Sequence, residues 1–81
     1  MNVEVKFFAL AQQQAGCESL AMELAEGCTV GDLRRQIAST IPAVADLLDH
    51  TMIAVNHKYA ANEEVLVDGA EVAIIPPVSG G

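Results

Sequence analysis

The residues best suited to chemistry stand at the carboxyl end of the chain, after an apolar run at 71–75. They are Pro76, Pro77, Val78, Ser79, Gly80 and Gly81. Glycine has no side chain, so the last two residues are thin enough to enter a narrow active site and can adopt almost any backbone angle. The reactive group would be the Gly81 carboxylate.

A carboxylate is a poor electrophile at pH 7, so acyl chemistry at Gly81 must begin with activation of the carboxylate, and adenylation by ATP achieves this. A sulfur nucleophile would then leave a thiocarboxylate, whereas an amine would leave an amide.

The rest of the sequence offers no convincing acid–base pair, nucleophile or phosphate-binding loop. Cys17 and Cys28 are too few for a disulfide framework or a four-ligand metal site, and a two-iron ferredoxin is excluded because its cluster needs four thiolates. We interpret both as small apolar residues. His50 and His57 lie near expected turns without a matched ligand set. We therefore expect no metal and no cofactor bound by this chain, with ATP used by an activating partner.

Size and charge restrict the possible partners. The 81 residues suffice for one domain, yet 52% are hydrophobic, which predicts an exposed apolar patch and hence a protein partner. The net charge of −7 repels phosphate backbones and anionic lipids, so we expect no nucleic acid and no membrane as partner, and a basic protein surface is favoured. No run approaches the roughly 18 apolar residues of a membrane span, and the N-terminus alternates like a strand rather than resembling a signal peptide. We expect a cytoplasmic protein.

The spacing of apolar residues predicts the elements that position the tail. The expected strands are 3–7, 20–24, 51–55, 58–60 and 71–75, with the β-branched run at 51–55 as a central strand. Residues 9–15, closed by Gly16, fit a short helix or an irregular arm, and 43–48 fit one further helical turn. Asn56-His57 and Asp68-Gly69 are expected turns.

The main helix has a clear start and stop. Thr29 is expected as its N-cap, with Asp32 at the third helical position reaching back to free amides. A stripe at three- and four-residue spacing should face the sheet: Val30, Leu33, Ile37 and Ile41. Arg34 and Arg35 should face water, and Pro42 should end the helix.

One mixed sheet wrapped around one helix predicts an α+β fold, the ubiquitin-like β-grasp. The β-grasp domain should span 1–75, with an extended C-terminal tail at 76–81. Alternation along the strands places Phe8, Tyr59 and Ile75 on a shared outer surface near the root of the tail. We interpret this surface as a docking patch, in which each buried anchor would contribute about 1 to 3 kcal/mol to association.

Several segments resemble the small subunits of molybdopterin synthase. They are Val5-Lys6-Phe7-Phe8-Ala9, Thr29-Val30 with Leu33-Arg34, Ala54-Val55-Asn56, Asp68-Gly69 with Glu71-Val72-Ala73, and the ending from Pro76 to Gly81. The match spans essentially the whole chain. Its specific part is the diproline before a Val-Ser/Thr-Gly-Gly terminus, because a terminal Gly-Gly alone is a weak signal.

This resemblance implies a sulfur carrier of molybdenum cofactor biosynthesis that is not catalytic alone. An E1-like adenylyltransferase would activate Gly81, and sulfur delivery would convert its carboxylate to a thiocarboxylate. Gly80, which also has no side chain, would keep the end of the tail thin. The large synthase subunit would receive the tail and pass the sulfur to cyclic pyranopterin monophosphate. Two transfers would build the molybdopterin dithiolene, in a heterotetramer of two small and two large subunits.

Three alternatives remain open. A sulfur carrier of the thiamine pathway uses the same fold and thiocarboxylate chemistry, although such chains are usually shorter and lack this Pro-Pro-Val approach. A ubiquitin-like protein modifier would instead form an isopeptide bond through Gly81, after the same adenylation step. A plain binding module would carry the Gly-Gly end incidentally.

Overall fold

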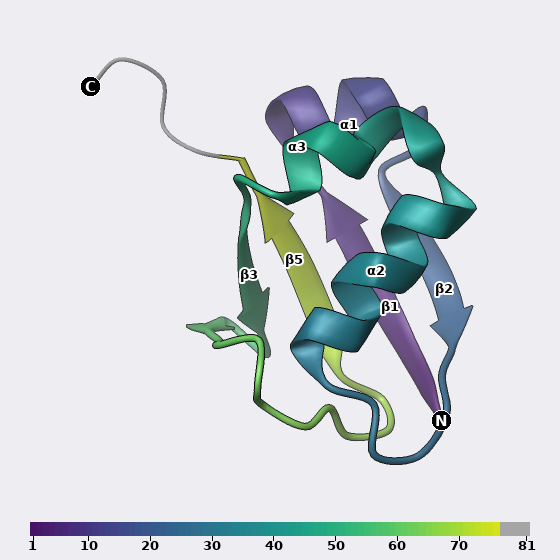
Figure 1. Ribbon diagram of the computed structural model, residues 1–81, viewed down its shortest axis with the longest axis vertical. Coiled ribbons are helices and arrows are strands. Elements are labelled where there is room, and N and C mark those ends of the chain that lie inside the picture. The colour runs from purple at the N-terminus through teal and green to yellow at the C-terminus, as the bar shows by residue number, and fades with distance from the viewer. Residues whose placement is uncertain (77–81) are drawn as a thin grey trace.

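The computed structural model describes residues 1–76, in which helices cover one face of a mixed sheet (Figure 1). The strands are β1 (Asn2–Phe7), β2 (Ser19–Glu23), β3 (Met52–Val55), β4 (Lys58–Tyr59) and β5 (Glu71–Ile75). The helices are α1 (Ala9–Ala15), α2 (Val30–Thr40), the 3-10 helix η1 (Pro42–Val44) and α3 (Ala45–Leu48). This is the predicted α+β arrangement, a β-grasp. None of the helices in residues 1–76 is long and apolar enough to cross a membrane.

The sheet has the strand order β2-β1-β5-β3-β4, with β1 parallel to β5 and the other pairs antiparallel. The strand predicted as central at 51–55 corresponds to β3, which is an interior strand between β5 and β4, while β5 is the middle strand of the five. Only Ala54 and Val55 of β3 pair with β4, so Met52 and Ile53 have β5 as their single strand neighbour. Met52 is accordingly exposed, whereas Ile53 and Ala54 are buried.

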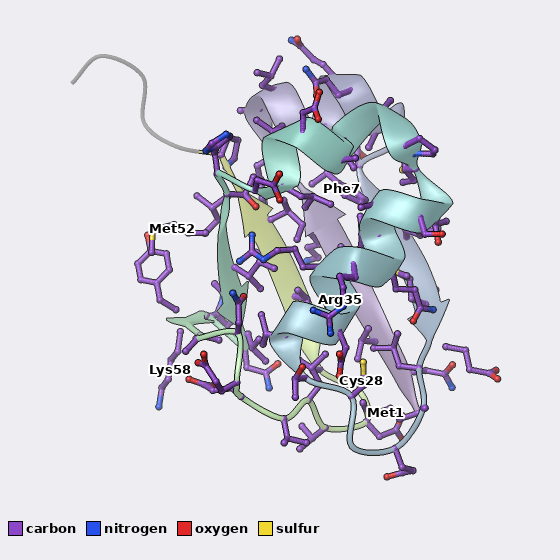
Figure 2. The ribbon with its side chains drawn as sticks, viewed as in Figure 1. Met1, Phe7, Cys28, Arg35, Met52 and Lys58 are labelled. Carbon is purple, nitrogen blue, oxygen red and sulfur yellow. The ribbon has the colours of Figure 1, made fainter. Side chains whose placement is uncertain are left out.

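Alternation along the strands buries one face of the sheet against α2. The largest side chains that are fully buried come from both layers: Phe7, Leu33, Ile37, Leu48, Ile53 and Ile74. Figure 2 shows Phe7 between the sheet and the helices. Each such side chain contributes about 1.5–3 kcal/mol by leaving water. The outer face of the sheet carries the alternate residues and is therefore free to form a site.

The predicted capping box at the start of α2 is confirmed. The backbone N–H of Asp32 donates to Thr29 Oγ1 at 3.1 Å, and the backbone N–H of Thr29 donates to Asp32 Oδ2 at 3.1 Å. The bond from the Thr29 N–H, in which the carboxylate is the acceptor, is the main reason why the pKa of the Asp32 carboxyl is lowered, and the Thr29 side chain and Arg35 lower it further. Pro42 follows the helix end and begins η1.

The expected turn at Asn56-His57 is a two-residue hairpin with φ of 50° and 71°, as the right-handed twist of the flanking strands favours. Asn56 also ties this hairpin to the start of β5. Its backbone N–H donates to the Glu71 carbonyl at 2.8 Å, and its side-chain Oδ1 accepts from the Glu71 N–H at 3.0 Å. The hairpin is thereby held at a fixed place beside the central strand.

The prediction that Arg34 simply faces water is wrong. Its Nη1 donates to the Leu48 carbonyl, to the Thr51 carbonyl at 3.0 Å and to Thr51 Oγ1 at 3.1 Å. Its Nε donates to Asn62 Oδ1 at 3.3 Å. Partial burial lowers the pKa of this guanidinium, yet the group stays charged. Arg34 thus joins α2 to the end of α3, to the start of β3 and to the loop at 60–64, whereas Arg35 is exposed as predicted.

Candidate functional site

The root of the predicted tail lies at the end of the central strand. Ile75 closes β5 opposite Met52 of β3, and β1 pairs with β5 in parallel as far as Ile74, so the strand that leads to Pro76 is held on both edges up to Ile74. Five of the predicted tail residues lie outside the described residues: Pro77, Val78, Ser79, Gly80 and Gly81. Their roles, and the division at 75 and 76, stay predictions.

An apolar groove lies on the outer face of the sheet, beside this root. It has a volume of about 330 Å³ and is lined by Phe8, Ala54, His57, Tyr59, Glu71, Ala73 and Ile75. The strand register explains it, because Ala73 and Ala54 are direct partners and Tyr59 pairs with Ala54. Two small side chains make the floor, and larger side chains stand around them. The structure therefore brings together the three residues that were predicted to share a docking patch.

The large side chains around the apolar groove are exposed. Phe8 is 47% accessible and Tyr59 66% accessible, while Ile75 is half-buried. Met52, the strand partner of Ile75, is 52% accessible and projects outward from β3 (Figure 2). Aromatic and apolar groups gathered next to a hollow on a small folded domain are typical of a protein interaction site.

Phe8 reaches the outer surface through a strained turn. β1 ends at Phe7, and Phe8 continues the extended backbone with φ −124° and ψ 152°, so its side chain points away from the core. Ala9 then turns the chain into α1 with φ of 50°. A left-handed backbone costs a residue with a Cβ roughly 1–2 kcal/mol. Strain of this kind collects at functional sites, where it fixes a neighbouring group.

Sequence reasoning missed three contributors to the apolar groove. Alternation along β5 places Ala73 on the outer face with Ile75, but only the strand register sets it against Ala54 and shows that the two alanines form the floor. His57 lines the groove because the two-residue turn carries it beside Tyr59, a placement that the predicted turn could have signalled. At the polar rim, Lys6 Nζ pairs with Glu71 Oε1 at 3.2 Å.

The remaining reactive groups lie away from the groove. Burial raises the pKa of the Cys28 thiol, and the nearby Asp32 raises it further, so this buried group stays protonated at neutral pH. Within residues 1–76, no three His, Cys, Asp or Glu side chains gather as metal ligands would. The candidate site within residues 1–76 is therefore the exposed apolar groove on the outer face of the sheet.

Comparison with known proteins identifies the family and the relatives of this chain. The sequence profile of the ThiS family matches residues 5–81. The molybdopterin synthase sulfur carrier subunit of Chlamydomonas reinhardtii is 39% identical over 83 residues, with all of both chains covered.

Two solved structures share the fold over the whole chain. SAMP1, a small archaeal modifier protein from Haloferax volcanii, superimposes with a TM-score of 0.89 at 30% identity, with 100% of each chain covered. A chain in the complex of subunits 1 and 2 of a molybdopterin-converting factor from Helicobacter pylori superimposes with a TM-score of 0.73 at 27% identity, again with 100% of each chain covered. On the strength of the profile match and the full-length relative, this β-grasp chain belongs to the ThiS family.

Proposed function

We propose that this chain is the sulfur carrier subunit of a molybdopterin synthase. Gly81 is adenylated, converted to a thiocarboxylate, and donates its sulfur to cyclic pyranopterin monophosphate to form the molybdopterin dithiolene. The full-length similarity to a sulfur carrier subunit of this enzyme supports the proposal. The structural observation that carries it is the exposed apolar groove beside Ile75, at the root of the tail.

The chemistry requires two partners. In the first step the Gly81 carboxylate attacks the α-phosphate of ATP on an E1-like adenylyltransferase, and pyrophosphate leaves. A sulfur nucleophile then displaces AMP, which leaves sulfur in place of one carboxylate oxygen. In the second step the large subunit receives the tail, the sulfur passes to the pterin, and water restores the carboxylate.

The apolar groove is the docking surface in this scheme. Its floor is apolar, and its one carboxylate, Glu71, is engaged by Lys6, so contact with the large subunit would bury Phe8, Tyr59 and Ile75. Each of these anchors contributes about 1–3 kcal/mol to association. The net charge of −7 suits a partner with a basic pocket for a phosphorylated pterin. We propose two small and two large subunits per complex, located in the cytoplasm.

The loading step is tested by intact mass. The chain is incubated with the adenylyltransferase of its host, ATP and a sulfide source, and its mass is recorded before and after. The expected result is a mass increase equal to the replacement of one oxygen by sulfur, mapped to Gly81 by fragmentation. An unchanged mass with an active adenylyltransferase would count against a sulfur carrier.

The docking step is tested separately with Phe8→Ala. Truncation of an aromatic anchor at an interface weakens binding by about 10- to 100-fold, which isothermal titration with the large subunit would detect. Val65→Ala is the matched control, because Val65 is 61% accessible but does not line the groove. Equal affinities of the two variants for the large subunit would show that the apolar groove is not the docking surface.

A protein modifier is the second candidate, favoured by the similarity to the archaeal modifier protein over the whole chain. The two functions share the acyl adenylate and differ in the nucleophile that attacks it. A sulfur carrier gives a thiocarboxylate, whereas a modifier gives isopeptide bonds to lysines of other proteins. Host lysate treated with ATP and tagged protein separates them, because only the modifier yields conjugates that resist thiol and hydroxylamine.

A further inference from the structure

A second hollow lies across Phe8 from the apolar groove. It has a volume of about 260 Å³ and is lined by Lys6, Phe7, Phe8, Gln12, Glu18 and Ser19. We name it the polar hollow. Phe8 lines both depressions and is therefore a ridge between them. A partner that contacts both faces of the Phe8 ring must also contact the polar hollow.

The walls of the polar hollow are fixed by the backbone. Lys6 of β1 and Ser19 of β2 are direct strand partners. The N–H of Phe7 donates to the Glu18 carbonyl at 2.9 Å, so Glu18 is held just beyond this pair. Gln12 comes from α1, where its N–H donates to the Phe8 carbonyl at 3.3 Å. Three elements thus present side chains to one small space.

The free groups in the polar hollow are mainly hydrogen-bond acceptors. Its cation, Lys6, is paired with Glu71 on the side of the apolar groove. The carboxylate of Glu18 is exposed and makes no ion pair or hydrogen bond within residues 1–76. The side-chain carbonyl of Gln12 and the hydroxyl of Ser19 can accept further bonds. A planar guanidinium, with five donors in a fixed fork, matches a carboxylate flanked by such acceptors.

We propose that the polar hollow is a subsite for an arginine side chain of the large subunit. This proposal rests on the proposed function, because it names a contact of the same docking surface. The apolar groove supplies affinity, and the arginine pairs with Glu18 on the other side of Phe8. Two contacts on opposite sides of one ridge fix the rotation of the carrier on its partner. That rotation sets the direction in which the chain leaves Ile75.

The test uses Glu18→Gln, which keeps the shape of the side chain and removes its charge. Titration with the large subunit at low salt should show an affinity about three- to tenfold below that of the wild type, and the difference should shrink as salt is added. Glu23→Gln is the matched control, because Glu23 is an exposed carboxylate at the other end of β2 that lines neither depression. It should bind like the wild type.

Three outcomes would overturn the subsite. If Glu18→Gln binds like the wild type while Phe8→Ala is weakened, the docking surface stands and the arginine subsite is wrong. If Glu23→Gln is weakened as much as Glu18→Gln, the effect comes from net charge alone. If Phe8→Ala and Glu18→Gln both bind like the wild type, the docking surface itself is misplaced. Circular dichroism melts of each variant confirm that the fold is intact, which is expected because both carboxylates are exposed.

Discussion

Replacement of Arg34 by alanine should destabilise the domain far more than the same change at its neighbour Arg35. Both are helix arginines that the sequence places on the solvent side. Arg34 alone donates hydrogen bonds to the carbonyls of Leu48 and Thr51 and to the Asn62 side chain. Its removal would detach the end of α3 and the segment leading into β3.

The magnitude follows from these partly buried contacts. A hydrogen bond from a charged donor contributes about 1.5–3 kcal/mol. The Leu48 carbonyl keeps a bond from Thr51 Oγ1 at 3.1 Å, and water can reach Asn62, so the losses do not simply add. We expect Arg34→Ala to lower the free energy of unfolding by about 2–3 kcal/mol. For a domain of this size, the loss corresponds to a fall in Tm of roughly 10–20 °C.

The assay is urea unfolding followed by circular dichroism, with Arg35→Ala as control. Within residues 1–76, Arg35 makes only an exposed ion pair with Asp32 three residues earlier, so its loss should cost less than about 0.5 kcal/mol. Arg34→Lys should be more stable than Arg34→Ala but less stable than the wild type, since an ammonium can replace some of the donors of the planar guanidinium but not their forked arrangement. Unfolding of Arg34→Ala and Arg35→Ala at the same urea concentration would show that the hydrogen bonds of Arg34 add no stability.

Three further predictions concern the cap, the strained turn and the tail. The N–H of Thr29 donates to the Asp32 carboxylate and lowers the pKa of that carboxyl in the folded chain. The stabilisation by this hydrogen bond is complete above the unfolded-state pKa of about 3.9, and it is lost as the pH falls through the lower pKa of the folded state. Asp32→Asn should therefore be less stable than the wild type at pH 7, with the gap closing below about pH 4 in urea titrations; a constant gap would contradict this. Ala9→Gly should leave the free energy of unfolding unchanged or raise it by up to about 1 kcal/mol, because the strain at positive φ is relieved. Gln13→Gly inside α1 is the control and should lower the free energy of unfolding by about 1 kcal/mol. Equal losses of stability for the two variants in calorimetry would argue against strain at Ala9. Gly81→Ala should leave the melting curve unchanged and cripple thiocarboxylate formation in the mass assay, and full loading of this variant would show that the terminus tolerates a side chain.

The fold was largely predictable because its signals are local. Alternating apolar residues located the strands, and the capping residues Thr29 and Asp32 located the start of α2. The turn at Asn56-His57 followed from residue type. Each of these signals lies within a few residues of the structure that it specifies, so no knowledge of the tertiary arrangement was needed.

The rest depends on contacts between distant segments. Arg34 finds its acceptors 14 and 17 residues away, at Leu48 and Thr51, and nothing in its own helix indicates them. The apolar groove exists because the register sets Ala54 against Ala73, a pairing that composition cannot supply. Its aromatic rim could be predicted, since Phe8 breaks the alternation of β1, but the hollow beside that rim could not.

A single-turnover sulfur transfer tests whether this chain is the sulfur donor of a molybdopterin synthase. The thiocarboxylated chain is mixed with the large subunit and cyclic pyranopterin monophosphate, while the intact mass of the chain and the dithiolene product are followed together. The sulfur-carrier function predicts that two thiocarboxylates return to carboxylates for each dithiolene formed, and that Phe8→Ala slows this exchange at limiting protein concentration. A thiocarboxylate that persists beside an active large subunit, with no dithiolene formed, would contradict it.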